Sequence, residues 1–428
     1  MKVVFSLSIH IVGIISCELF SSYFDSSSSD WFMAAQVERV LLITANVGSL
    51  FEQDRRLQDA WLKTFTERIN EEMADFVVIH MQETGGKHYV ECAWQVPKLI
   101  DELLLRMPMY PAVQTYLDLD HTAPNFTALG SVILVKARCI GSVSQYNFKT
   151  SSYLPVVKGV NILLDGLENS PLIIKKKFPK DFWPTFKWGR KGILDFVNVH
   201  LFHDESNLAL IHENPFLYST NRKRALDYVL DQLTSSGSWS TSHCFVFGDF
   251  NFRLDSTSFL NRLTERASAH PLEEPHGSVA DGLLCASSAT TPETLRRTVS
   301  AIEFRRESLN EISSGLVLRI ERKRFDYFNQ KKLLDDWKSY LEDDREARNF
   351  AQLHELPISF PPTYPWSEDP DESEVMMKTR APAWCDRVLM NDGAFALVRK
   401  GSSTYSSFGR DVCTGDHKPV ALAFSMSS

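Results

Sequence analysis

The chain has 428 residues, of which 43% are hydrophobic and 23% charged, and it carries a formal net charge of −8. This length fits one large or two ordinary folded domains, and the acidic balance argues against a nucleic-acid-binding protein, which usually carries a basic footprint. The seven cysteines are odd in number and include no C-x-x-C pair, which favours reduced thiols in the cytosol over a disulfide or zinc framework.

The chain opens with a short apolar run over residues 3–17, which has the length of a signal-peptide core and is too short for a comfortable transmembrane helix. A serine run at 26–29 then precedes Met33, directly before the first predicted strand. We therefore predict an N-terminal extension, residues 1–32, that is signal-like or disordered and stays outside the fold, followed by a folded domain over residues 33–428. We expect a cytoplasmic protein, while the apolar run leaves a secreted or membrane-anchored form open.

Strand and helix patterns alternate from residue 37 onward. Runs of β-branched and aliphatic residues predict strands, in chain order, at 40–44, 76–79, 132–135, 193–201, 244–247 and 420–424. Apolar residues at helical spacing predict amphipathic helices over 57–69 and 226–233. The sequence contains no phosphate-binding glycine loop of the GxGxxG or GxxxxGK[ST] type. This alternation predicts an α/β fold.

Two segments carry no chemistry that the pattern identifies. Residues 256–355 are charged and mainly helical in pattern, so we expect a helix-rich insertion or surface layer. Residues 175–191 alternate lysine and arginine with phenylalanine and tryptophan. Such a run could contact a nucleic acid by charge and stacking, attract an inositol polyphosphate or an anionic membrane, or be a solvated loop.

Polar side chains close several of the predicted strands. Asn46 and Glu83 each follow an apolar run, where an amide is often a turn residue and a glutamate often an exposed loop residue. Asp249 and Asn251 are two residues apart, so on an extended chain both point to one face, although an Asx turn fits the same spacing. Hard cations such as Mg²⁺ prefer oxygen ligands of these kinds.

Three segments occur in order: FGDFNFRL at 247–254, PAWCDR at 382–387 and GDHKPV at 415–420. Together they resemble the inositol polyphosphate 5-phosphatase family, whose GDxNxRL and WCDR signatures they match. The finer pattern resembles the type I branch, which acts on soluble inositol trisphosphate, because proline follows the PTY segment at 362–364 where lipid-acting members commonly have lysine. The resemblance spans residues 37–424 and implies a four-layer αββα sandwich of the DNase I-like (endonuclease/exonuclease/phosphatase) fold.

The resemblance also implies roles for individual residues. The catalytic set is Asp249 as the base that activates water, Asn251 as an orienting residue, His417 with its partner Asp386, and His200 as a phosphate contact. An imidazole beside a carboxylate is held in one tautomer and favoured in its charged form. The metal ligands are Glu83, Asn46 and Asp416. The substrate-binding residues are Lys378 and Arg380 on a neighbouring ring phosphate, Arg253, and Arg387, for which a buried structural role fits equally well.

These roles predict a Mg²⁺-dependent hydrolase that removes the 5-phosphate of inositol 1,4,5-trisphosphate, and of the 1,3,4,5-tetrakisphosphate, and so ends calcium-mobilising signalling. Cys385 is followed directly by Asp386-Arg387 and so does not begin the CX5R motif of phosphatases that form a phosphoenzyme. We therefore expect no covalent intermediate. The expected partner is the inositol polyphosphate substrate, with no nucleic acid. Weak membrane association stays open, without a C-terminal prenyl anchor because no cysteine follows Cys413. The alternatives are a phosphoinositide-lipid 5-phosphatase, a nuclease of the same fold, and a binding module with an inactive site.

Overall fold

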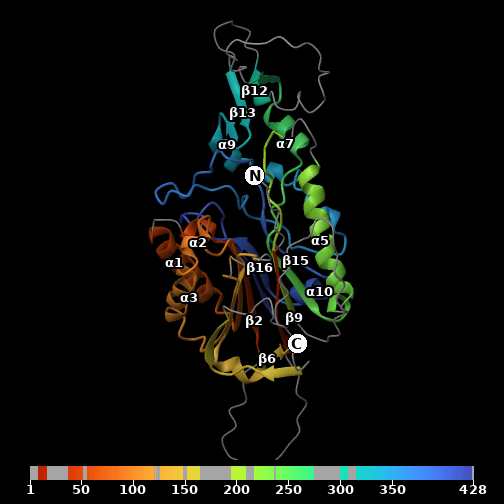
Figure 1. The fold of residues 1–428 in the computed structure, drawn as a ribbon. Coiled ribbons are helices and arrows are strands. Elements are labelled where there is room, and N and C mark those ends of the chain that lie inside the picture. The colour runs from red at the N-terminus through yellow and green to blue at the C-terminus, as the bar shows by residue number, and fades with distance from the viewer. Residues whose placement is uncertain are drawn as a thin grey trace, which may run out of the picture.

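Two β-sheets lie face to face, with helices on the outer side of each (Figure 1). The computed structural model describes residues 8–16, 37–51, 55–119, 121, 126–147, 152–163, 194–208, 216–235, 238–273, 299–306 and 315–426. One sheet has seven strands in the order β16 (Ser403–Ser407), β17 (Val420–Ser425), β2 (Arg39–Asn46), β3 (Phe76–Gln82), β5 (Gly130–Val135), β4 (Ala112–Leu117) and β8 (Gly159–Leu163). The other has six, in the order β15 (Asp386–Met390), β10 (His243–Asp249), β9 (Leu194–His200), β1 (Ser8–Ser16), β6 (Ser144–Asn147) and β7 (Ser152–Pro155).

Helices cover both outer faces of the sandwich (Figure 1). On the side of the seven-stranded sheet lie α1 (Arg55–Glu72), α2 (Tyr89–Cys92) and α3 (Gln95–Leu105), with the short 3-10 turns η1 (Gly48–Phe51) and η2 (Ala137–Ser142) nearby in the chain. On the side of the six-stranded sheet lie α5 (Leu217–Ser235), α6 (Ser238–Thr241) and α10 (Asp392–Lys400).

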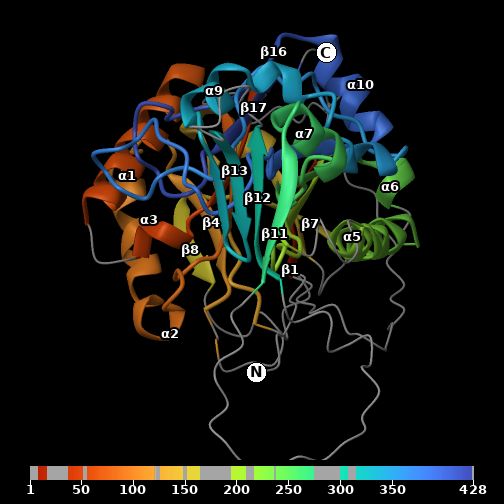
Figure 2. The same ribbon diagram turned by 90° about the horizontal axis from the view of Figure 1, so that it is seen from above.

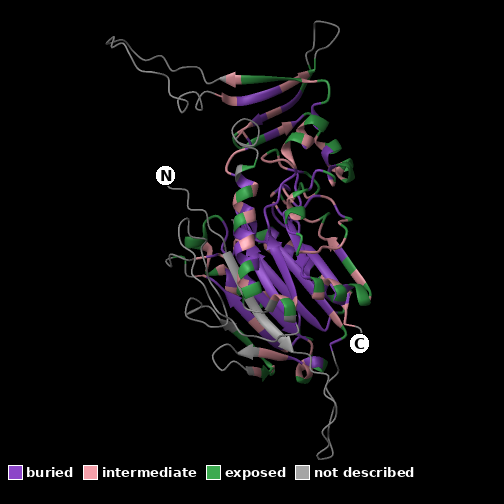
Figure 3. Cartoon of the chain, turned by 90° about the vertical axis from the view of Figure 1, so that its right-hand side faces the viewer, coloured by how far each residue is buried: buried purple, intermediate pink, exposed green. Residues whose placement is uncertain are grey.

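Alternation along β2 explains the layers. Val40 and Leu42 pack into the core between the two sheets, whereas Leu41 and Ile43 pack into a second core against α1 and α3. Every one of these side chains is buried, because a strand in the middle of a sandwich is covered on both faces (Figure 3). The predicted four-layer α/β sandwich is therefore confirmed.

The two predicted amphipathic helices are also confirmed. The apolar stripe of α1, which includes Trp61, Phe65 and Ile69, is buried against the seven-stranded sheet. The stripe of α5, which includes Leu226 and Val229, packs on the outer face of the six-stranded sheet. Each strand predicted from the sequence lies within or close to an observed strand.

The prediction of a helix-rich segment over residues 256–355 was wrong. The described part of this segment holds a separate four-stranded antiparallel sheet in the order β11 (Ser268–Glu273), β12 (Val299–Arg306), β13 (Gly315–Glu321) and β14 (Arg324–Tyr327). It lies at one end of the sandwich (Figures 1 and 2) with the short helices α7 (Ser256–Leu263) and α9 (Gln330–Asp335) and the turns η3 (Trp337–Tyr340) and η4 (Glu346–Asn349).

The charges in this sheet were mistaken for a helix face. They form ion pairs on one face of the sheet: Arg319 on β13 contacts Glu303 on the neighbouring β12 at 3.1 Å and Glu321 on its own strand at 2.7 Å. Leu318 and Ile320, which alternate with Arg319 and Glu321 along β13, are buried in the hydrophobic core. An antiparallel sheet with one charged and one buried face produces this composition as readily as a helix does.

The N-terminal segment also differs from the prediction. Residues 8–16 form β1, which pairs antiparallel with β9 from Ser8 opposite His200 to Ile15 opposite Leu194, and with β6 on its other side. The expectation that all of residues 1–32 stay outside the fold was therefore wrong for this strand. Its run of isoleucine and valine has the β propensity of an interior strand.

The basic and aromatic run at 175–191 lies outside the described residues. Within the part of the chain that the structure describes, no helix is long and apolar enough to cross a membrane.

Candidate active site

Three adjacent strands bring the first site residues together by their register. His200 is the last residue of β9, and it stands opposite Asp249, the last residue of β10, in a parallel pair. Asp249 in turn stands opposite Asp386, the first residue of β15, in an antiparallel pair. Residues opposite each other in a sheet point to the same face, so the three side chains meet at one end of the six-stranded sheet. Gly248 allows the close pairing, because a Cβ there would lie 1.9 Å from the carbonyl oxygen of Val199.

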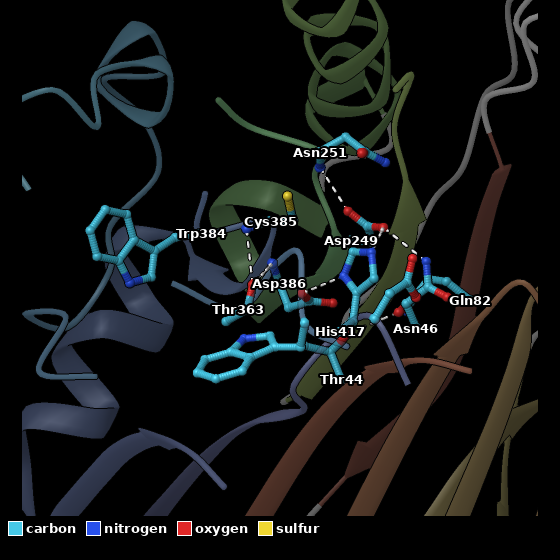
Figure 4. Close-up of polar contacts among 12 residues, drawn as sticks. Thr44, Asn46, Gln82, Asp249, Asn251, Thr363, Trp384, Cys385, Asp386 and His417 are labelled. Carbon is cyan, nitrogen blue, oxygen red and sulfur yellow. Dashed lines mark hydrogen bonds and ion pairs between the residues drawn. The ribbon is translucent and has the colours of Figure 1, made fainter. Parts of the chain in front are cut away.

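Asp249 is the centre of the site (Figure 4). Its Oδ2 accepts a hydrogen bond from Asn46 Nδ2 at 3.1 Å and lies 3.6 Å from His200 Nε2 and 3.9 Å from His417 Nε2. Its Oδ1 accepts a hydrogen bond from the Asn251 amide at 2.8 Å. Burial on its own would raise the pKa of Asp249, but the charges of His417 and His200 and the two hydrogen bonds lower it below its ordinary value. The carboxylate is therefore ionised at neutral pH although it is 1% exposed.

His417, in the loop before β17, is held between two carboxylates. Its Nδ1 lies 2.8 Å from Asp386 Oδ2, and the Asp386 amide donates to Thr363 Oγ1 at 3.2 Å (Figure 4). Burial would lower the pKa of His417, but Asp386, followed by Asp249, raises it to about 10. One ligand-type atom from each of these three residues lies within 4.8 Å of the others, as in a metal site. His417 Nδ1 is already engaged by Asp386 and the three side chains are buried, so we assign the trio to proton and charge chemistry.

Glu83 follows β3 and is the accessible carboxylate of the site, with its side chain 40% exposed. Its Oε1 accepts a hydrogen bond from Asn46 Nδ2 at 3.1 Å and lies 3.7 Å from His200 Nε2. Gly48 leaves room for it, because a Cβ at that position would lie 2.5 Å from Glu83 Oε2. Its backbone has a φ of 56°, an uncommon value for a residue with a side chain.

The charges around Glu83 fit a cation. Burial raises the pKa of Asp416, and the negative charges of Glu83 and Glu368 act in the same direction against the opposing charge of His417. Glu83 and Glu368 both raise the pKa of Asp416, and a cation bound beside Asp416 would relieve that repulsion. Oxygen donors suit a hard ion such as Mg²⁺. The side chains present therefore fit a divalent metal at Glu83 and Asp416.

Asn46 contributes in a different way from the prediction. Its amide nitrogen donates to both Glu83 and Asp249, while its oxygen accepts the Gly48 amide at 3.0 Å. The structure therefore shows a bridge that fixes the distance between two carboxylates. A role of Asn46 as a metal ligand stays a prediction.

Sequence reasoning missed a second network beside Asp416. Ser49 Oγ contacts Asp416 Oδ1 at 3.1 Å and Glu368 Oε1 at 2.7 Å, and Lys87 Nζ contacts the same Glu368 oxygen at 2.7 Å. Ser49 lies in η1, and Lys87 and Glu368 lie in two loops far from each other in the sequence; none of them closes a predicted strand. No sequence pattern marks them.

Asn251 and Arg253 form a pair beside Asp249. Asn251 Oδ1 accepts a hydrogen bond from Arg253 Nη2 at 2.8 Å, and its Nδ2 donates to the carbonyl of Leu201 at 3.1 Å. The Arg253 guanidinium lies over the Tyr364 ring at 4.7 Å. Its Nε and Nη1 are buried and have no hydrogen-bond partner among the described residues, so it can donate to a ligand.

The other predicted substrate residues divide into two groups. Lys378 Nζ contacts Asp326 at 2.9 Å, and Arg380 donates to backbone carbonyls beside a cavity that it lines together with Arg253. Arg387 is elsewhere: its guanidinium is buried and contacts Asp344 at 2.9 Å and Glu355 at 2.5 Å.

The prediction of Arg387 as a phosphate contact was therefore wrong. Successive side chains of a strand point to opposite faces, so with Asp386 directed at His417 the next residue must point away from the site. There it satisfies two buried carboxylates.

Comparison with known proteins agrees with this geometry. Residues 318–423 match the Endonuclease/Exonuclease/phosphatase family 2. A probable type I inositol 1,4,5-trisphosphate 5-phosphatase of Caenorhabditis elegans is 56% identical over 405 residues, which cover 90% of this chain and 99% of that protein. Inositol polyphosphate-5-phosphatase A of Rattus norvegicus is 41% identical over 412 residues, which cover 91% of this chain and 94% of that protein.

A solved structure of the inositol polyphosphate 5-phosphatase domain of SPSynaptojanin, in complex with inositol (1,4)-bisphosphate and calcium ion, aligns with a TM-score of 0.45 and 15% identity over 91% of this chain and 84% of that chain. The two sequence similarities extend over nearly the whole of each protein, and they agree with the motifs at Asp249, Asp386 and His417. The chain belongs to the inositol polyphosphate 5-phosphatase family.

Proposed function

We propose that the chain is a Mg²⁺-dependent phosphatase that removes the 5-phosphate of soluble inositol 1,4,5-trisphosphate, and also that of inositol 1,3,4,5-tetrakisphosphate. The observation that supports this substrate is the 56% identity to the Caenorhabditis elegans protein, over 99% of its length, because that protein is named after inositol 1,4,5-trisphosphate. The convergence of His200, His417 and Asn46 on one oxygen of Asp249 supports a hydrolytic site.

Asp249 is the proposed base. Its Oδ1 is held by a backbone amide, so Oδ2 is the oxygen that faces the two imidazoles and accepts the proton of the attacking water. A bond then forms between the water oxygen and phosphorus while the bond from phosphorus to the ring oxygen breaks, and the departing ring oxygen takes a proton from a solvent water to leave as a hydroxyl group. The lowered pKa of Asp249 keeps it in the form that accepts a proton at neutral pH.

His417 and His200 are the proposed stabilisers of the phosphoryl oxygens. With a pKa of about 10, His417 is an imidazolium at neutral pH and can donate from Nε2 while Asp386 holds its Nδ1. When bound, Mg²⁺ supplies Lewis-acid stabilisation of negative charge on phosphoryl oxygens. Glu83 and Asp416 would hold it.

Arg253, Arg380 and Lys378 are the proposed contacts of the ring phosphate next to the scissile one. Arginine offers a planar pair of donors to a phosphate and lysine a single positive charge. Arg253 has two buried nitrogens without partners among the described residues, and Arg380 lines the same cavity.

Phosphate release tests the proposal directly. The purified chain should release phosphate from inositol 1,4,5-trisphosphate with Mg²⁺ and not with EDTA, and faster than from a phosphoinositide in vesicles or from abasic DNA. Glu83→Gln should abolish most turnover and leave the melting temperature unchanged, because one accessible carboxylate contributes little to stability. Glu91→Gln, an exposed glutamate on the following helix α2, is the matched control and should behave as the wild type.

The outcomes separate the alternatives. Faster release from the vesicle lipid would make the chain a lipid phosphatase, and cleavage of abasic DNA would make it a nuclease. Substrate binding without release would indicate an inactive binding module. Full activity of the metal-free chain would contradict the assignment of Glu83.

We also propose a cytoplasmic location with at most weak membrane association. The composition supports it, since the cysteines are scattered and the five described ones are free thiols. Fractionation of cells that express the whole chain tests it. Recovery of the protein in a salt-resistant membrane fraction, or in the medium, would contradict it.

A further inference from the structure

The β13–β14 hairpin of the four-stranded sheet contacts the segment that carries the proposed phosphate-binding cations. The Phe325 amide donates to the Lys378 carbonyl at 2.8 Å, and Asp326 Oδ1 lies 2.9 Å from Lys378 Nζ. At the hairpin tip, the Arg322 carbonyl accepts a hydrogen bond from Arg380 Nη1 at 3.2 Å. Both cations are therefore held by a sheet that has no part in the chemistry.

Asn207 joins this hairpin to the same segment. Its Nδ2 lies within hydrogen-bond distance of three carbonyl oxygens: Glu321 at 3.3 Å, Arg324 at 3.2 Å and Thr379 at 3.0 Å. The backbone N–H of Asn207 also donates to the Arg322 carbonyl at 3.0 Å. Asn207 is buried and belongs to the loop that follows His200, so it links the hairpin tip and the 378–380 segment to the catalytic strand β9.

The hairpin also forms a wall of the cavity that Arg253 and Arg380 line. Ile320 and Phe325 supply its apolar side, while Arg253 and Arg380 supply its cationic side. Burial lowers the pKa of Arg380, and the nearby charge of Arg253 acts in the same direction. The two guanidiniums therefore raise the positive potential of one small space.

Neither guanidinium is neutralised by a hydrogen-bonded carboxylate among the described residues. Among the described residues, the carboxylate oxygen next to the Arg253 guanidinium is Asp204 Oδ2, 3.9 Å from Nε, and Arg380 donates to carbonyls, including that of Asp204 at 3.0 Å. Arg253 is 9% exposed and keeps two donors free. A buried cationic wall with free donors is built for an anion.

We propose that Asn207 and the β13–β14 hairpin form a clamp that positions Arg380 and Lys378, and so sets the preference of the enzyme for substrates with a second phosphate beside the scissile one. The inference rests on the proposed function and assigns the insertion a role in substrate choice. Asn207 and Asp326 are positioning residues, because they act through the two cations and do not touch the substrate.

Asp326 positions Lys378 without cancelling its charge. The carboxylate also contacts Arg324 at 2.6 Å, so it keeps a counter-ion when Lys378 turns to a phosphate. Lys378 is half-exposed and has four rotatable bonds, so its free position is poorly defined. Without Asp326, Lys378 is no longer held in one position, and we expect this disorder to outweigh the removal of a carboxylate that competes with the phosphate for Lys378. We therefore expect kcat/KM to fall by about 2- to 10-fold.

The experiment compares two soluble substrates of the full-length chain: inositol 1,4,5-trisphosphate, and inositol 1,5-bisphosphate, which lacks the neighbouring 4-phosphate. Asn207→Ala should lower kcat/KM for the trisphosphate by about 10-fold, mainly through KM, because the cations lose their fixed geometry. It should change kcat/KM for the bisphosphate by less than about 2-fold. Asp326→Asn, which keeps the side-chain shape, should show the same selective loss in weaker form.

Two variants in the same insertion serve as controls. Asn329→Ala removes a side chain that accepts the Lys332 amide at the start of α9, and Lys332→Gln breaks the ion pair of Lys332 with Asp336; both residues lie outside the β13–β14 hairpin. In both variants the ratio of kcat/KM for the trisphosphate to kcat/KM for the bisphosphate should equal that of the wild type, even if the variant is less stable. If Asn207→Ala does not fold, Asp326→Asn decides the question.

Equal losses of kcat/KM on both substrates in Asp326→Asn and Asn207→Ala would overturn the clamp, because a general structural defect lowers activity on the two substrates alike. An unchanged ratio would overturn it as well. Equal kcat/KM of the wild type for the two substrates would remove the phosphate subsite on which the clamp acts. Release from neither substrate by the wild type would instead overturn the proposed function.

Discussion

Asp386→Asn is the substitution that tests the charge chemistry most directly. Asparagine keeps an oxygen that can accept the hydrogen bond of His417 Nδ1, now 2.8 Å from the carboxylate, and removes only the charge. A unit charge about 4 Å away at an effective dielectric constant of 20 is worth about 4 kcal/mol, or about three pH units of pKa. The pKa of His417 should therefore fall from about 10 to about 7.

The sign of the effect follows from the direction of this shift. His417 acts as an imidazolium, which is present below its pKa and lost as the pH rises through it. At pH 8 nearly all of His417 is charged in the wild type, whereas only about one tenth of it is charged in Asp386→Asn. Turnover of the variant should therefore be about 10-fold lower than that of the wild type at pH 8 and little lower at pH 6. The stability that the pair contributes is fully present below about pH 6.5, and it is lost as the pH rises through about 10 in the wild type.

The assay is phosphate release from pH 5.5 to pH 10 at saturating substrate and Mg²⁺, with the variant and wild type measured side by side. A cation beside Asp416 lowers the pKa of His417 in both enzymes, so the displacement of the alkaline limb between them is the diagnostic quantity. Asp392→Asn breaks another histidine–aspartate pair, the exposed contact of His354 with Asp392 at 2.5 Å, and should not move the limb. An alkaline limb that stays in place in Asp386→Asn would refute the assignment.

Three further substitutions have distinct readouts. Asp249→Asn should lower kcat by about 10²- to 10⁴-fold with little change in KM, and an equal loss of substrate binding would show a substrate contact instead of a base. Gly48→Ala places a Cβ 2.5 Å from Glu83 Oε2, so the Mg²⁺ concentration for half-maximal turnover should rise by about 10- to 100-fold; an unchanged metal dependence would contradict the metal assignment. Arg387→Met leaves two carboxylates without their buried partner and should lower the free energy of unfolding by about 3–5 kcal/mol, measured in urea. A raised KM at full stability would restore Arg387 as a phosphate contact.

The sequence predicts the layers and much of the site for one physical reason: both depend on short-range patterns. Apolar runs predict the strands, and a polar residue directly after a run predicts the end of a strand, which is where Asn46, Glu83, His200 and Asp249 lie. The family signatures then identify Asp386 and His417. The structure adds their distances and the bridge that Asn46 makes between two carboxylates.

The remaining features depend on contacts between distant segments. The facing direction of Arg387 follows from the register of β15, and Ser49 meets Glu368 only in the folded chain. The four-stranded sheet was missed because alternating charges over residues 299–321 suit a strand pair with one exposed face as well as a helix. Asn207 was missed because its partners are backbone carbonyls, which leave no trace in the sequence.

The register of β9, β10 and β15 has a consequence for how such an enzyme can diversify. His200, Asp249 and Asp386 are neighbours across the strands, so their spacing is fixed by the ladder and is independent of the length of chain between them. The four-stranded sheet, from residue 268 to residue 327, therefore lies in the chain between the second and third of these residues without displacing either. An enzyme built in this way can change its substrate when the segment inserted between these strands is replaced. Mutations in the strands themselves are restricted to changes that preserve strand pairing. The strand register fixes the spacing of these three residues, whereas the chain between them is not bound by it.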